Sequence, residues 1–374
     1  MAMTLVCNKN RLQDALGLAV RAVSTRTTQP ILECVLLTAN QEVGLTLTAS
    51  NLEISIETAP MEADIAVPGS IALDAKLFSE IVRKMPGEFV SITVDGNTQT
   101  VEVKSGRSRL NIVGQPGDEF PLMAQNVVAA DSSYRLNNQV VKDMIRQTIF
   151  SVSTDVAKPA LMGELIEVKE DTMRVVAVDM FRIAYKSTPL PPGATNVKAI
   201  VPAKAIGELG RMLPVGEDDF VDVQLTGKQI VFKASTFTLT SNLIEGEFIK
   251  YDQIFNEDFI TVVEINRVSL LEALERAILI ATENKMLPIK IQIEDENITI
   301  RAENERGETE DDIPCKTDGK PLNINFNPRY FIDILRAIDD ENVVLKFNTQ
   351  LSPCTIRGVD DDCDFKYLIV PLRQ

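Results

Sequence analysis

The side chains that could carry out chemistry in this sequence are carboxylates, lysines and hydroxyl groups, because the 374 residues include no histidine. Without histidine there is no Ser-His or Cys-His nucleophile pair and no imidazole metal ligand. Neither G-x-G-x-x-G nor G-x-x-x-x-G-K-[ST] occurs, so the sequence offers no recognisable phosphate-binding loop. These observations argue against most nucleophilic and nucleotide-dependent enzymes.

Three acidic clusters remain as candidate chemistry: Glu294-Asp295-Glu296, Glu303 to Asp312, and Asp360-Asp361-Asp362. Such clusters could bind a hard divalent cation, and a carboxylate-metal hydrolase is one alternative. None has EF-hand spacing, and each falls where a turn between strands is expected. Solvated acidic turns are the simpler interpretation, so we expect no catalytic residue, no metal site and no cofactor.

Cysteine usage and the N-terminus indicate a reducing compartment. The five cysteines contain no C-x-x-C pair and form no even framework, as is typical of free thiols in a cytosol. Met1 to Cys7 lacks the features of a signal peptide, and no apolar run reaches about 18 residues. We therefore expect a cytoplasmic protein without a membrane partner.

The organisation of the chain is visible in the stretch Ser105 to Phe120, SGRSRLNIVGQPGDEF. Polar and apolar residues alternate as on a half-buried strand, glycine and proline then mark a turn, and Glu119-Phe120 ends the unit. A similar alternation follows at Thr236 to Thr240 and is closed by Gly246-Glu247-Phe248. The distance between the two occurrences is about a third of the chain, so this recurrence would divide the chain into three.

Helix starts support the same division. First helices are predicted to begin near residues 8, 137 and 266, spaced by 129, and second helices near 74, 202 and 327, spaced by 128 and 125. The sequence therefore predicts an α+β protein of three homologous domains, at 1–125, 126–254 and 255–374. Each domain repeats a unit of one strand, one helix and three strands, with helices on one face and antiparallel sheets on the other.

Several local features define these elements. Asn8 and Asp74 are expected to cap their helices, and Pro202 is expected in the first turn of another. Leu77 is predicted to face inward with Ile81 and Val82. No strand is predicted between Pro68 and the helix at Asp74, or between Pro189 and Pro202.

The charge distribution qualifies the acidic composition. The net charge is −16 and the isoelectric point about 4.7, which alone argues against a nucleic-acid partner. However, the six predicted helices contain 14 basic and 8 acidic residues, a net +6, which leaves −22 elsewhere. Helix surfaces are commonly charged, but the excess also fits helices that face a polyanion. Such a surface would contact phosphates without reading base sequence.

Four segments resemble one known family. They are Gln29-Pro30-Ile31-Leu32, Ser105 to Arg109, Ala177 to Ala184, and Tyr367 to Arg373. On these motifs the chain resembles the bacterial DNA polymerase III beta subunit, the replicative sliding clamp. The resemblance implies a non-enzymatic, nucleoid-associated cytoplasmic protein. It would form a head-to-tail homodimeric ring around duplex DNA and tether the polymerase for processivity.

The resemblance also implies site residues. Basic side chains of the DNA channel would be Arg26, Lys76, Arg83, Lys142, Arg146, Lys204, Arg211, Arg276 and Arg336. The dimer interface would include Leu110, Ile112, Leu279 and Ile280, for which an ordinary core position is the alternative.

A pocket for short hydrophobic peptides of the polymerase, the clamp loader and other replication or repair proteins would be formed by Leu161, Val178, Phe181, Arg182, Ile183, Ile249, Ile254, Tyr330, Pro353, Leu368, Val370, Pro371, Leu372 and Arg373. Val178, Met180, Ile249 and Gln253 depart from the family pattern, so the peptide preference is open. A three-domain interaction scaffold without a DNA role is a further alternative.

Overall fold

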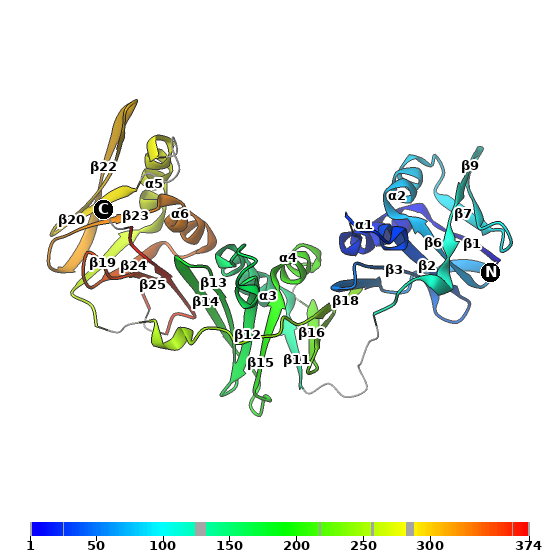
Figure 1. The fold of residues 1–374 in the computed structure, drawn as a ribbon, viewed down its shortest axis with the longest axis horizontal. Helices are drawn as coiled ribbons and strands as arrows, with labels where there is room; N and C mark the ends of the chain where they lie inside the picture. Colours follow the sequence, from blue (N-terminus) through cyan, green and yellow to red (C-terminus); the bar gives the residue numbers. More distant parts are fainter. Residues whose placement is uncertain are drawn as a thin grey trace. The chain divides into compact units, whose positions relative to one another are not determined.

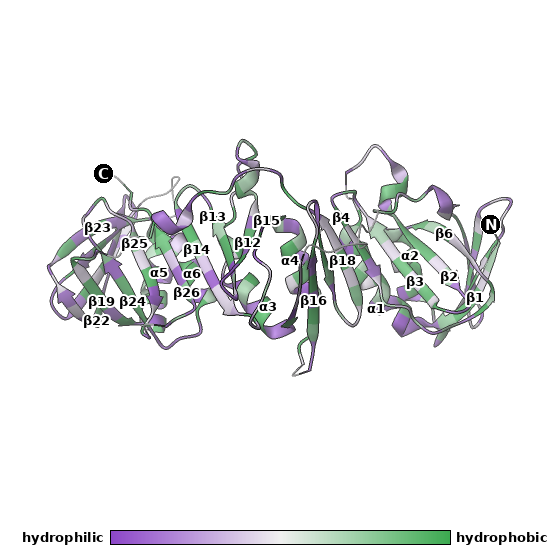
Figure 2. Cartoon of the chain, turned by 90° about the horizontal axis from the view of Figure 1, so that it is seen from below, coloured by the Kyte–Doolittle hydropathy of each residue, from purple (hydrophilic) through white to green (hydrophobic). Residues whose placement is uncertain are grey.

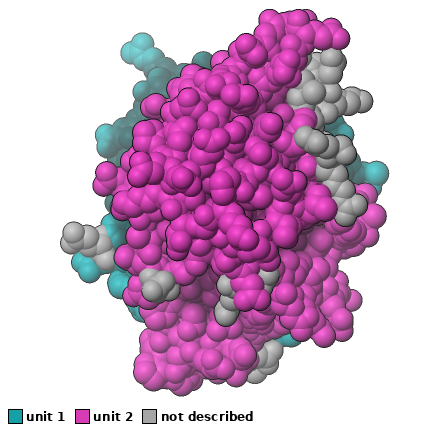
Figure 3. Space-filling view, turned by 90° about the vertical axis from the view of Figure 1, so that its left-hand side faces the viewer, with its two compact units in different colours: residues 1–139, 208–243 teal, residues 140–207, 244–374 magenta. Residues whose placement is uncertain are grey.

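A computed structural model describes residues 2–24, 26–123, 132–216, 218–255, 258–281, 288–360 and 362–372. It divides the chain into two compact units, residues 1–139 with 208–243 and residues 140–207 with 244–374 (Figures 1 and 3). Every strand pair is antiparallel. Hydrophobic and hydrophilic stretches alternate along the elements of both units (Figure 2).

Unit 1 contains two sheets. The five-stranded sheet has the order β5 (Ala63–Val67), β1 (Met3–Asn8), β7 (Phe89–Val94), β8 (Thr100–Ser105) and β9 (Ser108–Val113). The nine-stranded sheet has the order β10 (Gln115–Pro116), β6 (Gly69–Asp74), β2 (Cys34–Asn40), β3 (Gly44–Ser50), β4 (Ile54–Thr58), β18 (Phe237–Asn242), β17 (Gln229–Lys233), β16 (Phe220–Leu225) and β11 (Ser132–Asn137). Helices α1 (Lys9–Ala19) and α2 (Ala75–Lys84) pack together and against these strands.

Unit 2 contains one twelve-stranded sheet. Its order is β15 (Val197–Pro202), β12 (Gly163–Lys169), β13 (Thr172–Val178), β14 (Arg182–Pro189), β26 (Phe365–Ile369), β25 (Cys354–Gly358), β24 (Asn342–Phe347), β19 (Thr261–Asn266), β22 (Gly307–Gly319), β21 (Asn297–Asn304), β20 (Ile289–Ile293) and β23 (Leu322–Phe326). Helices α5 (Arg267–Ala281) and α6 (Pro328–Ala337) belong to unit 2, whereas the division between the units falls within α3 (Asn138–Arg146) and α4 (Ala203–Met212). Residues Leu270 and Leu274 of α5 and Phe331 and Leu335 of α6 are fully buried in the unit 2 core.

The predicted helix caps are confirmed. Asn8 Oδ1 accepts hydrogen bonds from the backbone N–H groups of Asn10 and Arg11 at 3.0 and 3.2 Å, and Asp74 Oδ1 accepts one from Leu77 N at 2.6 Å. Such bonds satisfy backbone donors that the first helical turn cannot pair internally. The predicted inward orientation of Leu77 is wrong, since this side chain is 49% exposed. Phe78 takes the buried position, because it shares a helical face with Ile81 and Val82.

A side-chain turn recurs at the same place in all three repeats. Asn51, Asp179 and Asn304 each accept two backbone N–H bonds from the residues two and three positions ahead, at 2.7–3.1 Å. This geometry is an Asx turn, in which a short polar side chain replaces a backbone acceptor. The spacings, 179 − 51 = 128 and 304 − 179 = 125, equal those of the second helices. The predicted threefold repetition is therefore confirmed at atomic detail.

The prediction missed one strand at an equivalent place in every repeat. These strands are β6, β15 and β23, and they pair with β2, β12 and β20. Pro202 is the last residue of β15, whereas α4 begins at Ala203. Prolines and glycines before these strands suggested loops, and the long-range pairing that makes them strands leaves no local signal.

No helix within the described ranges has the length and hydropathy that membrane crossing requires.

Candidate functional site

An apolar cavity of about 440 Å³ opens in unit 2, where β13, β14 and β26 lie side by side. Val178 pairs with Ile183 across the first strand pair, and Ile183 pairs with Leu368 across the second. Directly paired residues place their side chains on the same face of a sheet, so these three form a continuous apolar floor. The residues that line the cavity are Lys158, Ala160, Leu161, Val178, Asp179, Met180, Arg182, Ile183, Glu247, Ile249, Ile254, Leu368 and Val370.

Arg182 is held rigidly at the rim of this cavity. Its Nε donates to Asp179 Oδ2 at 2.9 Å, and its Nη1 donates to Asp333 Oδ2 at 2.6 Å. The guanidinium also lies 4.8 Å from the centre of the Tyr330 ring, within the range of a cation–π contact. The Arg182 side chain is only 11% exposed. Its position is therefore fixed before any ligand arrives, which lowers the entropic cost of binding.

The structure brings together eight of the fourteen residues predicted for a peptide pocket. Phe181 and Tyr330 lie beside them as a stacked pair with ring centres 6.0 Å apart. Pro353, Pro371 and Leu372 do not line the cavity, and Arg373 lies outside the described residues. The eight that line it are Leu161, Val178, Arg182, Ile183, Ile249, Ile254, Leu368 and Val370.

The predicted pocket set lacks five lining residues, although the sequence singles out one of them, Met180, as a departure from the family pattern. The five are Lys158, Ala160, Asp179, Met180 and Glu247. Asp179 carried a signal, because an Asp three positions before an Arg in a turn can bind both the backbone and the guanidinium. Lys158 and Ala160 precede the 3-10 helix Pro159–Leu161 or lie within it, and their position depends on tertiary packing. No local pattern in the sequence distinguishes them.

The chain matches three family models in succession. They describe the N-terminal, central and C-terminal domains of the DNA polymerase III beta subunit and match residues 3–124, 135–250 and 252–373. The beta sliding clamp of Bacillus subtilis strain 168 is 31% identical over 99% of this chain and all of that protein. This chain belongs to the DNA polymerase III beta subunit family.

Solved structures support the same relationship. A proposed DNA polymerase III beta subunit from Eubacterium rectale is 38% identical, with a TM-score of 0.94 and full coverage of both chains. The Bacillus subtilis DNA polymerase sliding clamp is 30% identical, with a TM-score of 0.95 and full coverage of both chains. The resemblance, the fold class and the sliding-clamp function expected from the sequence are therefore confirmed.

The nine basic residues predicted for the DNA channel of this beta subunit fall into two groups. Seven are exposed, whereas Lys142 and Arg146 are partly buried. Five form ion pairs with nearby carboxylates: Arg83 with Glu80, Arg146 with Asp143 and Asp339, Arg211 with Glu208, Arg276 with Asp311, and Arg336 with Glu275.

Three of the other predicted channel residues have no nearby carboxylate among the described residues to compensate their charge. Within the described part of the chain, Arg26, Lys76 and Lys204 form no ion pair with a carboxylate. Burial opposes the charge of Arg146, yet the hydrogen bonds that its guanidinium donates to Asp339 and Asp143 outweigh this effect and raise the pKa of Arg146. The positive potential of the helices is consequently smaller than the count of basic residues suggested.

The residues predicted for the dimer interface of the beta subunit lie on two exposed elements. Leu110 is 42% exposed on β9, the edge strand of its sheet, and Ile112 is partly exposed on the same strand. Leu279 is 72% exposed on α5, whose buried face is formed by other residues. Ile280 is partly buried against the unit 2 core. An ordinary core position therefore describes Ile280 better than Leu279.

The acidic clusters have separate structural roles. Glu294-Asp295-Glu296 forms the turn between β20 and β21, as expected. Glu308 to Asp312 lies within β22 rather than in a turn, because the turn that joins β21 to β22 is confined to Glu305 and Arg306. Asp361 lies outside the described residues. Among the residues that are described, no three acidic or cysteine side chains converge in a group that could hold a metal ion.

Proposed function

We propose that two copies of this chain close head to tail into a ring around duplex DNA. In this proposal, each copy contributes three domains, at 1–125, 126–254 and 255–374. The observation that carries the proposal is a strand pairing that occurs twice within the chain. β4 of the first repeat pairs with β18 of the second, and β14 of the second pairs with β26 of the third.

By the same correspondence, β9 and the first half of β22 lack the partner that their equivalents have. Within the described residues β9 pairs only with β8, and residues 307–314 of β22 pair only with β21, since β19 pairs with residues 315–319. β9 of the first repeat corresponds to β18 of the second, because the same cross-strand pair occurs in both. Leu110 pairs with Val103 in the first repeat, and 129 residues later Leu239 pairs with Phe232. β22 corresponds to β4, because each follows the Asx turn of its repeat, at Asn304 and Asn51 respectively. Pairing β9 of one copy with β22 of the other would complete the series. Heterologous interfaces that close by rotation generate rings.

The register of this pairing can be derived from the repeat. Leu239 pairs with Ile56 inside the chain. Ile56 lies five positions after the turn residue Asn51, and Thr309 lies five positions after Asn304, so Leu110 would lie opposite Thr309 at the proposed interface. Arg109 would then lie opposite the partner's Glu310. Arg109 already pairs with Glu102 and Glu310 with Arg301 in its own chain, so the interface would join these two ion pairs into one network of alternating charge, which favours this register. β22 contains Glu308, Glu310, Asp311 and Asp312, whereas β9 and its turn contain Arg107 and Arg109.

DNA binding in the ring would be electrostatic and independent of base sequence. Arg26, Lys76 and Lys204 would supply most of the attraction, because carboxylates within the chain already compensate five other channel residues. Weak, diffuse contacts to phosphates allow a protein to slide along DNA. Retention would then come from topology, so the chain needs no catalytic residue to confer processivity on a polymerase.

The apolar cavity would receive short hydrophobic peptides from the replicative polymerase, the clamp loader and other replication or repair proteins. Its apolar floor and its fixed arginine rim suit an aliphatic or aromatic anchor residue. Met180 and Ile249 make the walls more apolar than the family pattern.

The first test is native mass by light scattering over a dilution series. A chain of 41.3 kDa should form a dimer of twice that mass. The ring should remain on nicked circular DNA and slide off when that DNA is linearised. A monomer at every concentration would refute the ring. For the cavity, Ile254→Asp should lower peptide affinity by about tenfold or more without altering the dimer, since Ile254 is 40% exposed.

A further inference from the structure

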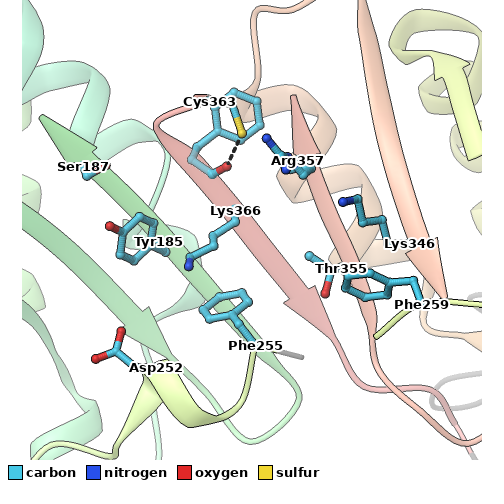
Figure 4. Close-up of a pocket in the computed structure, with 11 residues that line it drawn as sticks. Tyr185, Ser187, Asp252, Phe255, Phe259, Lys346, Thr355, Arg357, Cys363 and Lys366 are labelled. Carbon is cyan, nitrogen blue, oxygen red and sulfur yellow. Dashed lines mark hydrogen bonds between the residues drawn. The ribbon is translucent and has the colours of Figure 1, made fainter. Parts of the chain in front are cut away.

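A second cavity, of about 450 Å³, lies on unit 2 and differs in character from the apolar one. Figure 4 shows side chains converging on it from neighbouring strands and from the segment that leads into β19. Tyr185 comes from β14, Lys366 from β26, Arg357 from β25 and Lys346 from β24. Phe259 closes one side.

The lining of this cavity is cationic in a strongly acidic protein. Lys346, Arg357 and Lys366 face one lining carboxylate, that of Asp252, whereas the whole chain carries −16. The nearby Asp364 carboxylate accepts a 2.6 Å hydrogen bond from Lys186. An anionic ligand would be repelled by most of the surface and attracted here.

Aromatic rings hold the lysines in place. The Lys366 ammonium lies 4.8 Å from the ring centre of Tyr185 and 4.6 Å from that of Phe255. The Lys346 ammonium lies 5.2 Å from the ring centre of Phe259. These are cation–π contacts, and they occupy ring faces on which a nucleobase would otherwise stack. The geometry thus favours carboxylates over nucleic acid.

The Lys346 ammonium group is available to pair with a carboxylate of a ligand. Over the residues that the structure describes, no carboxylate lies within ion-pair distance of its ammonium group. Its side chain is partly buried, and an ion pair formed there is less screened by solvent than one on an open surface.

The cationic cavity continues the apolar one along the same strands. Ile183 and Leu368 pair on the floor of the apolar cavity, and two residues further along each strand Tyr185 pairs with Lys366. Residues two apart on a strand share a face and are separated by roughly 7 Å. An extended peptide anchored in the first cavity therefore reaches the second within a few residues.

We propose that the cationic cavity binds an acidic segment that flanks the hydrophobic anchor of a partner peptide. The inference rests on the proposed function, because that function supplies the anchor. A carboxylate of the segment pairs with Lys346, so the cavity selects among partners that share a similar anchor.

Fluorescence polarisation with defined peptides tests this assignment. The reference probe is a fluorescein-labelled hexapeptide with leucine and phenylalanine as its apolar anchors, compared with versions that carry three glutamates or three glutamines at either end. We expect the glutamate extension at one end to tighten binding by roughly three- to tenfold at about 50 mM salt, and the gain to vanish near 500 mM. The glutamine extensions should have no such effect.

Variants locate the effect. Lys346→Glu and the milder Lys346→Gln should remove the glutamate gain while leaving affinity for the reference probe unchanged. Lys290→Glu is the matched control, because Lys290 is exposed on β20 of the same unit and has the same charge. This control should retain the gain.

Three outcomes would overturn the inference. The first is equal affinity for glutamate and glutamine extensions, with the reference probe still bound, which leaves the proposed function intact. The second is loss of the glutamate gain in Lys290→Glu, which would indicate a general effect of net charge. The third is binding of oligothymidylate that depends on Lys346, which would assign the cavity to single-stranded DNA. Failure of the reference probe itself to bind would refute the proposed peptide site.

Discussion

Glu164 provides the sharpest test of the energetics of this fold. The side chain is fully buried on β12, and burial raises its pKa to about 8, against a weaker opposing effect of the hydrogen bond with Thr148. Thr148 Oγ1 lies 2.8 Å from Glu164 Oε1 and 2.7 Å from the carbonyl oxygen of Met144. A hydroxyl has one hydrogen for these two acceptors. A protonated Glu164 resolves the competition, because its own O–H can donate to Thr148.

The sign of the pH effect follows from proton binding. Between about pH 4.5 and pH 8 the unfolded chain has lost the Glu164 proton and the folded chain has kept it. The free energy of unfolding therefore falls as pH rises through this window, by about 1.4 kcal/mol per unit for this group. Below pH 4.5 the contribution is fully present, and above pH 8 its loss is complete. The total change is on the order of 5 kcal/mol.

Glu164→Gln removes the titration while keeping the shape, and its amide N–H can donate to Thr148 Oγ1 in place of the carboxyl O–H. At pH 7.5 the variant should gain about 2–3 kcal/mol, because a few kcal/mol of ionisation cost disappears and burial of an amide offsets part of it. The measurement is urea unfolding of wild type and variant from pH 5 to 8.5. Glu170→Gln on the exposed turn after β12 is the control. Parallel pH curves for wild type and Glu164→Gln, with a constant offset, would refute the reasoning.

Two further predictions concern the proposed surfaces, and a third concerns two buried cysteines. The triple variant Arg26→Glu, Lys76→Glu, Lys204→Glu should shorten retention on nicked circular DNA more than reversal of the ion-paired Arg83, Arg211 and Arg336, because the latter are already compensated; the opposite order would contradict this assignment. Leu279→Asp should shift the dimer to monomer in light scattering with little loss of stability, since the side chain is 72% exposed, and an unchanged dimer would exclude Leu279 from the interface. Burial raises the pKa of Cys7 to about 12 and also raises that of Cys354, so a thiol reagent at pH 8 should label both only after unfolding.

The repeat, the helix caps and most of the strands could be predicted from the sequence, because they depend on local patterns. Asn8 and Asp74 are short polar residues before an apolar helical stripe, and they cap as expected. Leu77 was assigned to the wrong face because Phe78 beside it fits the same stripe equally well. β6, β15 and β23 were missed because their partners lie far away in the sequence.

The candidate surfaces were harder to predict, because they depend on which side chains meet. The positive charge counted over the helices includes arginines whose carboxylate partners lie in other segments, such as Asp311 in β22 and Asp339 after α6. The cationic cavity combines Lys346, Arg357 and Lys366 from three strands, and no motif joins them. A count of charges along the chain cannot show such pairings.

The three Asx turns differ in the side chains that they carry, and this difference accounts for the arginine at the rim of the apolar cavity in the second repeat. Each turn precedes a strand at the edge of its repeat, but the residue three positions after the turn residue differs. It is Ile54 in the first repeat, Arg182 in the second and Gly307 in the third. Only in the second repeat is the turn residue an aspartate, and its carboxylate caps the turn and also pairs with the arginine. An asparagine would preserve the turn but leave the partly buried guanidinium with one carboxylate fewer. In the second repeat Asp179 stands where the other two repeats have asparagine, and Arg182 follows it. These two residues make the shared turn the rim of the apolar cavity.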